Sequence, residues 1–231
     1  MVILFVVAAM VIATVITIVV GRSGFSPGPF DRDDRSGTGV LSAEVSGFSY
    51  PLRGACLPED SYLMPGALRE YRQGVHEGVD FYGSDNCVPI GLDTEVVAAK
   101  AGTVIRADWA YEGLNAETLA DLMQRVEQDG GDDSEVLSAF RGRQVSIDHG
   151  DGVVTRYAHL NGIAEGIDVG TRVEPGQLIA YVGDSGTPTS VTAPGTEVHL
   201  HFEIRIGNTY LGQDVTDPEQ ARLLYQQAFS P

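Results

Sequence analysis

The sequence predicts a mainly β domain with an antiparallel core, one inserted α-helix and an N-terminal transmembrane helix. Many short runs rich in β-branched residues, separated by hairpin turns, favour the antiparallel core. A single long stretch with apolar residues at helical spacing favours the inserted helix. With 231 residues, the chain has room for one domain of ordinary size plus appendages.

The N-terminal helix is predicted because residues 1–20 are all apolar or small, about the length needed to span a bilayer core. We expect residues 1–21 to be a transmembrane anchor, with a cleaved signal peptide as the alternative. No basic segment precedes the apolar run and no clear Ala-x-Ala site ends it, which favours the anchor. Residues 22–45 are rich in Gly, Ser, Pro and Asp, and we expect a flexible linker that leads into a domain over 46–231.

Strands are predicted from alternation and turn signals along this domain. The runs 94–99 and 102–107 are short and β-branched, and we expect them to pair as a hairpin. Two later runs are joined at Asp151-Gly152, which is a strong hairpin signal. The remaining expected strands are 143–149, 152–159, 171–173, 178–183 and 197–206.

Two helices are predicted in the domain. Apolar spacing near 3.6 residues over 114–129 indicates an amphipathic helix, which Gly130-Gly131 ends. This helix lies in an acidic stretch, since residues 108–135 hold nine Asp or Glu against one arginine. An N-cap Asp followed by Pro predicts a second helix over 217–229.

Charge and cysteine content limit the partners and the compartment. The net charge is −17, with one lysine and fourteen arginines, so no basic stripe is present to bind nucleic acid. Cys56 and Cys87 are the only cysteines. Beside an export signal they are most simply a disulfide closing a loop of about thirty residues. Two unrelated buried thiols are the alternative.

Four of the five histidines, with one aspartate, form a pattern typical of a zinc site. Neutral imidazole and carboxylate are ligands that zinc accepts, and a catalytic zinc needs three of them plus an open position. His76 and Asp80 are four residues apart in a glycine-punctuated segment that is a poor helix, so we infer a bend near Gly78 that folds them together.

The other histidines come from two later segments. His199 and His201 are two residues apart, so on a strand they share a face while Leu200 turns into the core. His159 follows Tyr157-Ala158 at the end of a predicted strand. A single site requires these three distant segments to converge. We interpret His149, next to a turn, as structural.

Six segments in chain order match the motifs of one known family. They are His-x-Gly-x-Asp at 76–80, Val97-Ala98 with Gly102-x-Val104, Val145-x-Ile147-x-His149-Gly150-x-Gly152, Thr155-x-Tyr157-Ala158-His159-Leu160, Val173-x-x-Gly176-Gln177 and His199-Leu200-His201-Phe202-Glu203. On these motifs the chain resembles the M23 zinc metallopeptidases, the lysostaphin and LytM-type endopeptidases that cut peptidoglycan peptides. The resemblance covers a core from about 74 to 207.

The resemblance implies that His76, Asp80 and His201 bind one zinc ion and that His159 and His199 are the catalytic histidines. Spacing alone leaves the roles of His199 and His201 unassigned. The family fold, a small antiparallel β-sheet sandwich with the metal in a groove, is expected here.

Two further residue roles are left open by the sequence. Glu203 is interpreted either as the group that holds a ligand imidazole in its tautomer or as an exposed strand carboxylate. Tyr71 and Tyr82 either line the groove or pack elsewhere.

The chain departs from the family pattern in a long acidic insertion, residues 109–142, and in a long loop over 184–195. Both are expected to border the groove. Its acidic part, residues 108–135, is interpreted either as a lid over the groove or as a solvated surface helix.

Together these features predict a membrane-anchored, extracytoplasmic zinc metalloendopeptidase that hydrolyses peptide bonds of peptidoglycan stem peptides or cross-bridges. Its expected partners are peptidoglycan peptides and, through residues 1–20, the cell membrane; the protein would be secreted if that segment is cleaved. The alternative is a non-enzymatic LytM-like binder or activator that recruits another cell-wall hydrolase. One zinc per chain and cleavage of peptidoglycan distinguish the enzyme from the binder.

Overall fold

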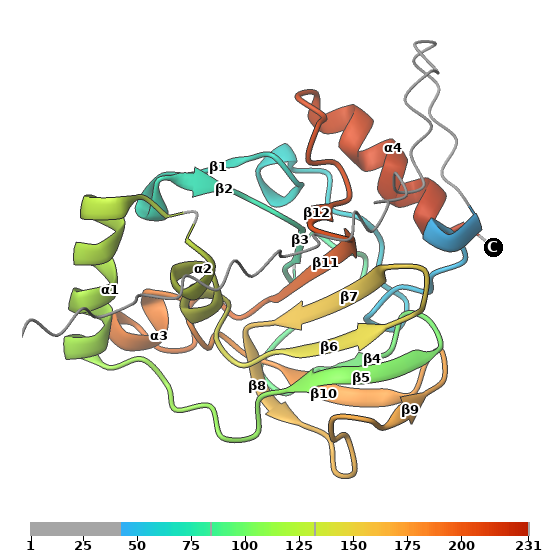
Figure 1. Ribbon diagram of the computed structural model, residues 1–231, viewed down its shortest axis with the longest axis horizontal. Helices are drawn as coiled ribbons and strands as arrows, with labels where there is room; N and C mark the ends of the chain where they lie inside the picture. The colour runs from blue at the N-terminus through green and yellow to red at the C-terminus, as the bar shows by residue number, and fades with distance from the viewer. Residues whose placement is uncertain (1–42, 84, 132, 231) are drawn as a thin grey trace, which may run out of the picture.

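The computed structural model describes residues 43–83, 85–131 and 133–230 (Figure 1). The predicted anchor at 1–21 and most of the predicted linker lie outside these residues. Within the described ranges, no helix has the length and apolar character needed to cross a membrane.

The larger part of the domain is a seven-stranded sheet whose strand pairs are all antiparallel. Its strands run in the order β12-β11-β7-β6-β5-β9, and β3 also pairs with β11. Their bounds are β3 (Val79–Phe81), β5 (Gly102–Ala107), β6 (Val145–Asp148), β7 (Val153–Ala158), β9 (Arg172–Val173), β11 (Leu200–Ile206) and β12 (Thr209–Tyr210).

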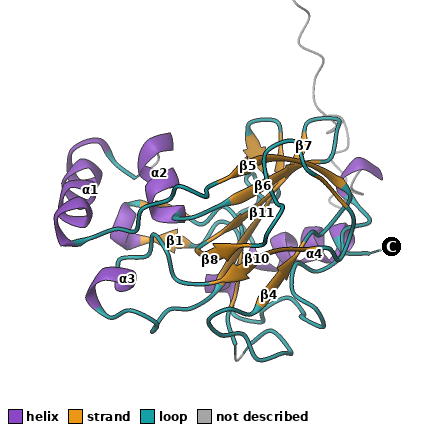
Figure 2. Ribbon diagram, turned by 90° about the horizontal axis from the view of Figure 1, so that it is seen from below, coloured by secondary structure: helices purple, strands orange, loops and turns teal. Residues whose placement is uncertain are grey.

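A three-stranded antiparallel sheet lies beside it in the order β4-β10-β8, and β1 and β2 form a small separate ladder (Figure 2). The bounds are β1 (Leu68–Arg69), β2 (Gly74–Val75), β4 (Glu95–Val97), β8 (Leu160–Ile163) and β10 (Leu178–Val182). Because alternate residues of a strand face opposite sides, each sheet turns one apolar face inward. The buried core combines Ile147 and Ile204 of the large sheet with Val96 and Ile179 of the small one. The mainly β, antiparallel fold is therefore confirmed.

The hairpin at Asp151-Gly152 is confirmed, since β6 and β7 pair across it and both residues have positive φ. The expected hairpin of 94–99 with 102–107 is wrong, because β4 pairs with β10 in the small sheet and β5 pairs with β6 and β9 in the large one. Residues 96–99 are all buried, as expected for a segment that passes between two layers.

The insertion holds two helices instead of the one predicted: α1 (Ala116–Asp129) and α2 (Ser134–Arg141). Both lie on the same side of the sheets (Figure 1). The Asp133 side chain accepts from two backbone N–H groups and starts α2, which is too short for its apolar spacing to stand out in the sequence. Two more α-helices are α3 (Thr189–Thr192), which was not predicted, and α4 (Pro218–Ala228), which was.

Three short 3₁₀ helices and a disulfide complete the description. The 3₁₀ helices are η1 (Ala43–Val45), η2 (Ser61–Leu63) and η3 (Glu70–Arg72). Cys56 and Cys87 form a disulfide, as predicted. The bond closes the segment that contains β1, β2 and β3, and so fixes both ends of the chain stretch that carries His76 and Asp80.

Candidate metal centre and active site

His76 and Asp80 reach one point because the chain bends between them and packs closely on β11. Gly78 lies at the bend, and a Cβ there would lie 2.3 Å from the carbonyl oxygen of Phe202, so only glycine allows this approach. The predicted bend is confirmed. Asp80 is then the register partner of His201 across β3 and β11, and residues directly opposite in an antiparallel pair share a face.

Three ligand atoms from His76, Asp80 and His201 lie in mutual contact; we call these residues the acceptor cluster. Nε2 of His76 is 2.9 Å from Oδ1 of Asp80 and 2.9 Å from Nδ1 of His201, which is 2.8 Å from the same Oδ1. All three side chains are buried. They alone, among the described residues, form a group of three or more potential metal ligands.

The outer nitrogen of each imidazole in the cluster already has an acceptor. Nδ1 of His76 lies 3.0 Å from the carbonyl oxygen of Met64, and Nε2 of His201 lies 3.0 Å from Oε1 of Glu203. These oxygens only accept, so the outer nitrogens donate and the inner nitrogens carry lone pairs in the neutral rings. Partners of this kind orient imidazoles that bind metals.

Asp80 is held from behind by a buried arginine. Nη2 of Arg69 donates to Oδ2 of Asp80 at 2.9 Å, which leaves Oδ1 directed at the two imidazoles. Burial alone would raise the pKa of Asp80, but charge interactions with His76 and His199 and hydrogen bonds with His201 and His76 outweigh it and keep this pKa well below its usual range. The carboxylate is therefore ionised.

The two imidazoles of the acceptor cluster have pKa values shifted in opposite directions. Burial lowers the pKa of His76 to about 4. Burial would also lower the pKa of His201, but Asp80 and Glu203 outweigh it and raise that pKa above the usual value. When both rings are neutral, two imidazole lone pairs and one carboxylate oxygen face the same point, and together they are a donor set for a divalent cation. Two nitrogen ligands and one oxygen ligand suit zinc in a catalytic site, so these residues fit the predicted ion.

His159 and His199 lie beside this cluster, and we call them the histidine pair. Their ring centroids are 4.5 Å apart. Each ring donates its Nδ1–H to a backbone carbonyl, His159 to Ser185 at 2.8 Å and His199 to Glu197 at 2.7 Å. In the neutral rings Nε2 therefore carries the lone pair. Burial lowers the pKa of both histidines.

The backbone of His159 changes direction where its side chain enters the site. Its φ is 58°, in the left-handed region that few non-glycine residues adopt. It stands between β7 of the large sheet and β8 of the small one, so the chain changes sheets at this residue. Such strain persists only where the surroundings over-determine it.

All five predicted histidine and aspartate positions line one cavity of about 300 Å³. Tyr71 and Tyr82 also line it, and the Tyr82 ring stacks on His199 with centroids 4.3 Å apart and planes at 11°. The fifth histidine, His149, hydrogen-bonds Ala101 and Thr155 and does not line this cavity.

The insertion forms one wall of the cavity through Leu137, Phe140 and Arg141 of α2. No described residue of the acidic stretch 108–135 lines this cavity, so the choice between a lid and a solvated surface helix for that stretch stays open. Glu203 is 0% exposed and hydrogen-bonds His201, so the interpretation as an exposed strand carboxylate is wrong.

Sequence reasoning missed Arg69 and Arg141. Both lie outside the recognised motifs, and the carboxylates that they contact are 11 and 62 residues away along the chain. Only Arg141 had a weak signal, because it ends an insertion that was expected to border the groove.

The sequence profile of peptidase family M23 matches residues 74–213. The chain belongs to this family. An L-Ala–D-Glu endopeptidase of Bacillus subtilis (strain 168) is 43% identical to this M23 chain over 63 residues, which are 27% of the chain and 19% of that relative. The match thus spans about a fifth of the relative's length.

Two solved structures are similar to the M23 chain. A zinc-containing peptidase from Vibrio cholerae aligns with a TM-score of 0.43 and 22% identity, over 71% of this chain and 38% of that one. The catalytic domain of the antimicrobial peptidase lysostaphin from Staphylococcus simulans aligns with a TM-score of 0.42 and 23% identity, over 64% and 84%. The family assignment rests on the sequence profile alone.

Proposed function

We propose that the protein is a zinc metalloendopeptidase that hydrolyses peptide bonds in the stem peptides of peptidoglycan. The observation that carries the proposal is the acceptor cluster, where two imidazole lone pairs and an ionised carboxylate oxygen converge within 2.9 Å beside a pair of buried histidines. Membership of peptidase family M23 supports hydrolysis, and the name of the Bacillus subtilis relative supports a peptidoglycan peptide as substrate.

His76, Asp80 and His201 would hold the zinc. A bound zinc ion lowers the pKa of a water molecule toward 7 and polarises a carbonyl oxygen. The histidine pair would transfer the protons of the reaction. One ring would accept at Nε2 a proton of the attacking water and pass it to the amine nitrogen as the C–N bond of the peptide breaks. The other ring, when protonated at Nε2, donates to the negative charge that develops on the carbonyl oxygen.

The tautomers of the histidines support these separate roles in zinc binding and proton transfer. Backbone carbonyls hold the Nδ1–H of His159 and of His199, so each ring offers Nε2 to the cavity chemistry. Nδ1 of His201 is 2.8 Å from Oδ1 of Asp80, whereas Nε2 of His199 is 3.8 Å from it. This difference favours His201 as the ligand and His199 as the proton-transfer group.

The proposed location is extracytoplasmic, with residues 1–20 as a single membrane anchor, or secreted if that segment is cleaved. The Cys56–Cys87 disulfide supports an oxidising compartment, because disulfides persist mainly outside the cytosol. Peptidoglycan is present in that compartment in bacteria.

The test is to incubate the full chain with defined muropeptides and to identify the products by mass spectrometry, after counting zinc per chain by atomic absorption. We expect one zinc per chain and new amino and carboxyl termini within the stem peptide. Substrates that retain only the Ala–Glu bond or only the cross-link bond identify which bond is cut. Zinc-loaded protein that binds peptidoglycan without cutting it would favour the binder or activator instead.

A further inference from the structure

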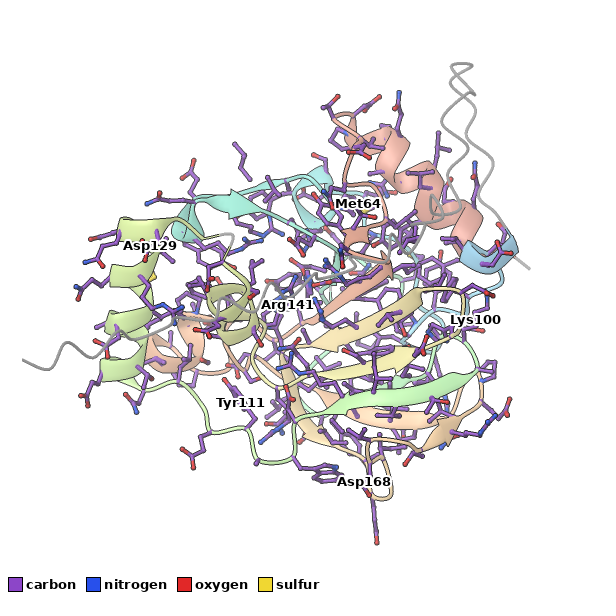
Figure 3. The ribbon with its side chains drawn as sticks, in the orientation of Figure 1. Met64, Lys100, Tyr111, Asp129, Arg141 and Asp168 are labelled. Carbon is purple, nitrogen blue, oxygen red and sulfur yellow. A yellow bond between two sulfur atoms is a disulfide. The ribbon has the colours of Figure 1, made fainter. Side chains whose placement is uncertain are left out.

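Arg141 is the last residue of α2, and Figure 3 shows it between the inserted helices and the strands of the large sheet. Its Nε donates to Oε1 of Glu203 at 2.6 Å, and its Nη2 donates to Oε2 of Glu77 at 2.5 Å. The arginine side chain is 11% exposed and the Glu203 side chain is fully buried. One guanidinium therefore joins two carboxylates that lie 126 residues apart in the sequence (203 − 77).

The two oxygens of Glu203 have different partners. Oε1 accepts from Arg141 and from Nε2 of His201. Oε2 accepts from Arg156 and Arg205, each at 2.8 Å. Among the arginines that the structure describes, only Arg141 shares an oxygen of Glu203 with the His201 imidazole, so this arginine directly holds the acceptor that sets the His201 tautomer.

Arg141 also contacts the other segments of the site. Its backbone carbonyl accepts from the backbone N–H of His159 at 2.9 Å. Its second carboxylate partner, Glu77, directly follows His76 in the chain. The end of the inserted helix thus touches all three segments that supply the site.

The end of α2 packs closely against its neighbours. Gly142, which follows Arg141, has a φ of 64°, and a Cβ there would lie 2.2 Å from the carbonyl oxygen of Ser185. The ring of Phe140, the residue before Arg141, meets that of Tyr71 edge-on with centroids 5.3 Å apart. The end of α2 is thus packed against the wall of the site.

We propose that Arg141 is a positioning residue of the metal centre. By holding Oε1 of Glu203, it keeps Nε2 of His201 protonated and presents the Nδ1 lone pair to the cation. The proposal rests on the zinc binding proposed above. It makes the insertion, by which this chain departs from the compact family pattern, a part of the metal centre.

Removing Arg141 should release Oε1 without neutralising Glu203. Arg156 and Arg205 would still hold the ionised carboxylate through Oε2, and the carboxylate would be free to turn away from His201. Lysine cannot replace the arginine, because a single ammonium group cannot serve as a planar fork between two carboxylates.

The experiment compares Arg141→Gln with Arg156→Gln in the full chain. Both changes remove one arginine from the same buried carboxylate, and they differ in which oxygen of Glu203 loses its partner. R141Q also removes the bond to Glu77, which keeps Arg205 as a partner. Zinc affinity is measured by competition with a chromophoric chelator. The His201 tautomer is read in the zinc-free protein from long-range ¹H–¹⁵N NMR correlations of the imidazole, at a pH above the raised pKa of His201, where the ring is neutral.

We expect R141Q to weaken zinc binding about 10- to 100-fold, the usual effect of losing a partner behind a metal ligand. The His201 signals should then show a mixture of tautomers. R156Q should weaken zinc binding less than about threefold and keep one tautomer, because the bond between Oε1 and the imidazole stays in place.

Equal zinc affinities for R141Q and R156Q, or an unchanged His201 tautomer in R141Q, would overturn the positioning role. If R141Q does not fold, the lysine pair R141K and R156K decides by the same comparison, with R141K expected to bind zinc more weakly. Failure of the unaltered protein to bind zinc would instead overturn the proposed function, so the two failures are distinct.

Discussion

The acceptor cluster and the histidine pair share one cavity but are held in different ways. Ionised side chains hold two members of the cluster, with Arg69 behind Asp80 and Glu203 behind His201, while His76 donates to the carbonyl oxygen of Met64. Main-chain carbonyls of the loop over 184–197 hold the pair. The charged partners keep Asp80 ionised and orient the Nδ1 lone pair of His201 for a cation. The neutral carbonyls fix the tautomer of each ring in the histidine pair and leave that ring free to gain and lose a proton.

The largest expected effect comes from removing a member of the cluster. His201→Ala should abolish both zinc binding and hydrolysis, because two ligands are too few for a stable catalytic site. Zinc per chain and product formation from muropeptides are the measurements. His149→Ala, which removes the histidine outside the cavity, is the matched control and should keep its zinc.

His199→Ala tests the other side of the comparison. It should leave zinc bound and reduce kcat by about 10²- to 10⁴-fold, the usual contribution of general acid–base catalysis. The same zinc and product assays apply. Loss of zinc equal to that in His201→Ala would show that the two groups of residues do not have separate roles.

Arg69→Met removes the ion-pair partner of Asp80 and should weaken the acceptor cluster. Breaking a buried ion pair leaves the Asp80 carboxylate uncompensated, which typically costs about 3–5 kcal/mol of unfolding free energy. Zinc affinity should fall about 10- to 100-fold. Denaturant unfolding and chelator competition measure both, with Arg53→Met as the control because Arg53 bonds the carbonyl oxygen of Gly176 at the surface and does not line the cavity. Unchanged zinc affinity would contradict the support role.

The smallest expected effect is on the histidine pair. Tyr82→Leu removes the ring stacked on His199, and such aromatic contacts contribute about 0.5–1.5 kcal/mol, so kcat should fall about 2- to 12-fold. Zinc affinity should not change. Tyr82→Phe keeps the ring and should behave as the unaltered protein; a loss of activity in that variant would point to the hydroxyl group instead.

The sequence alone determined the strongly local features. The 151–152 turn and the helix that begins at Asp217 were predictable because each depends on a few adjacent residues. So were the bend at Gly78 and the pairing of two lone cysteines. The candidate zinc residues could be found because their spacing is part of family motifs.

Only the tertiary structure decided which neighbours these residues have. The chain between β4 and β5 crosses from one sheet to the other, and no local signal separates that from a hairpin. Arg69 and Arg141 reach Asp80 and Glu203 only once strands and the inserted helix are packed. Ion pairs between distant residues depend on where the backbone has placed them, so a pattern of spacing cannot reveal them.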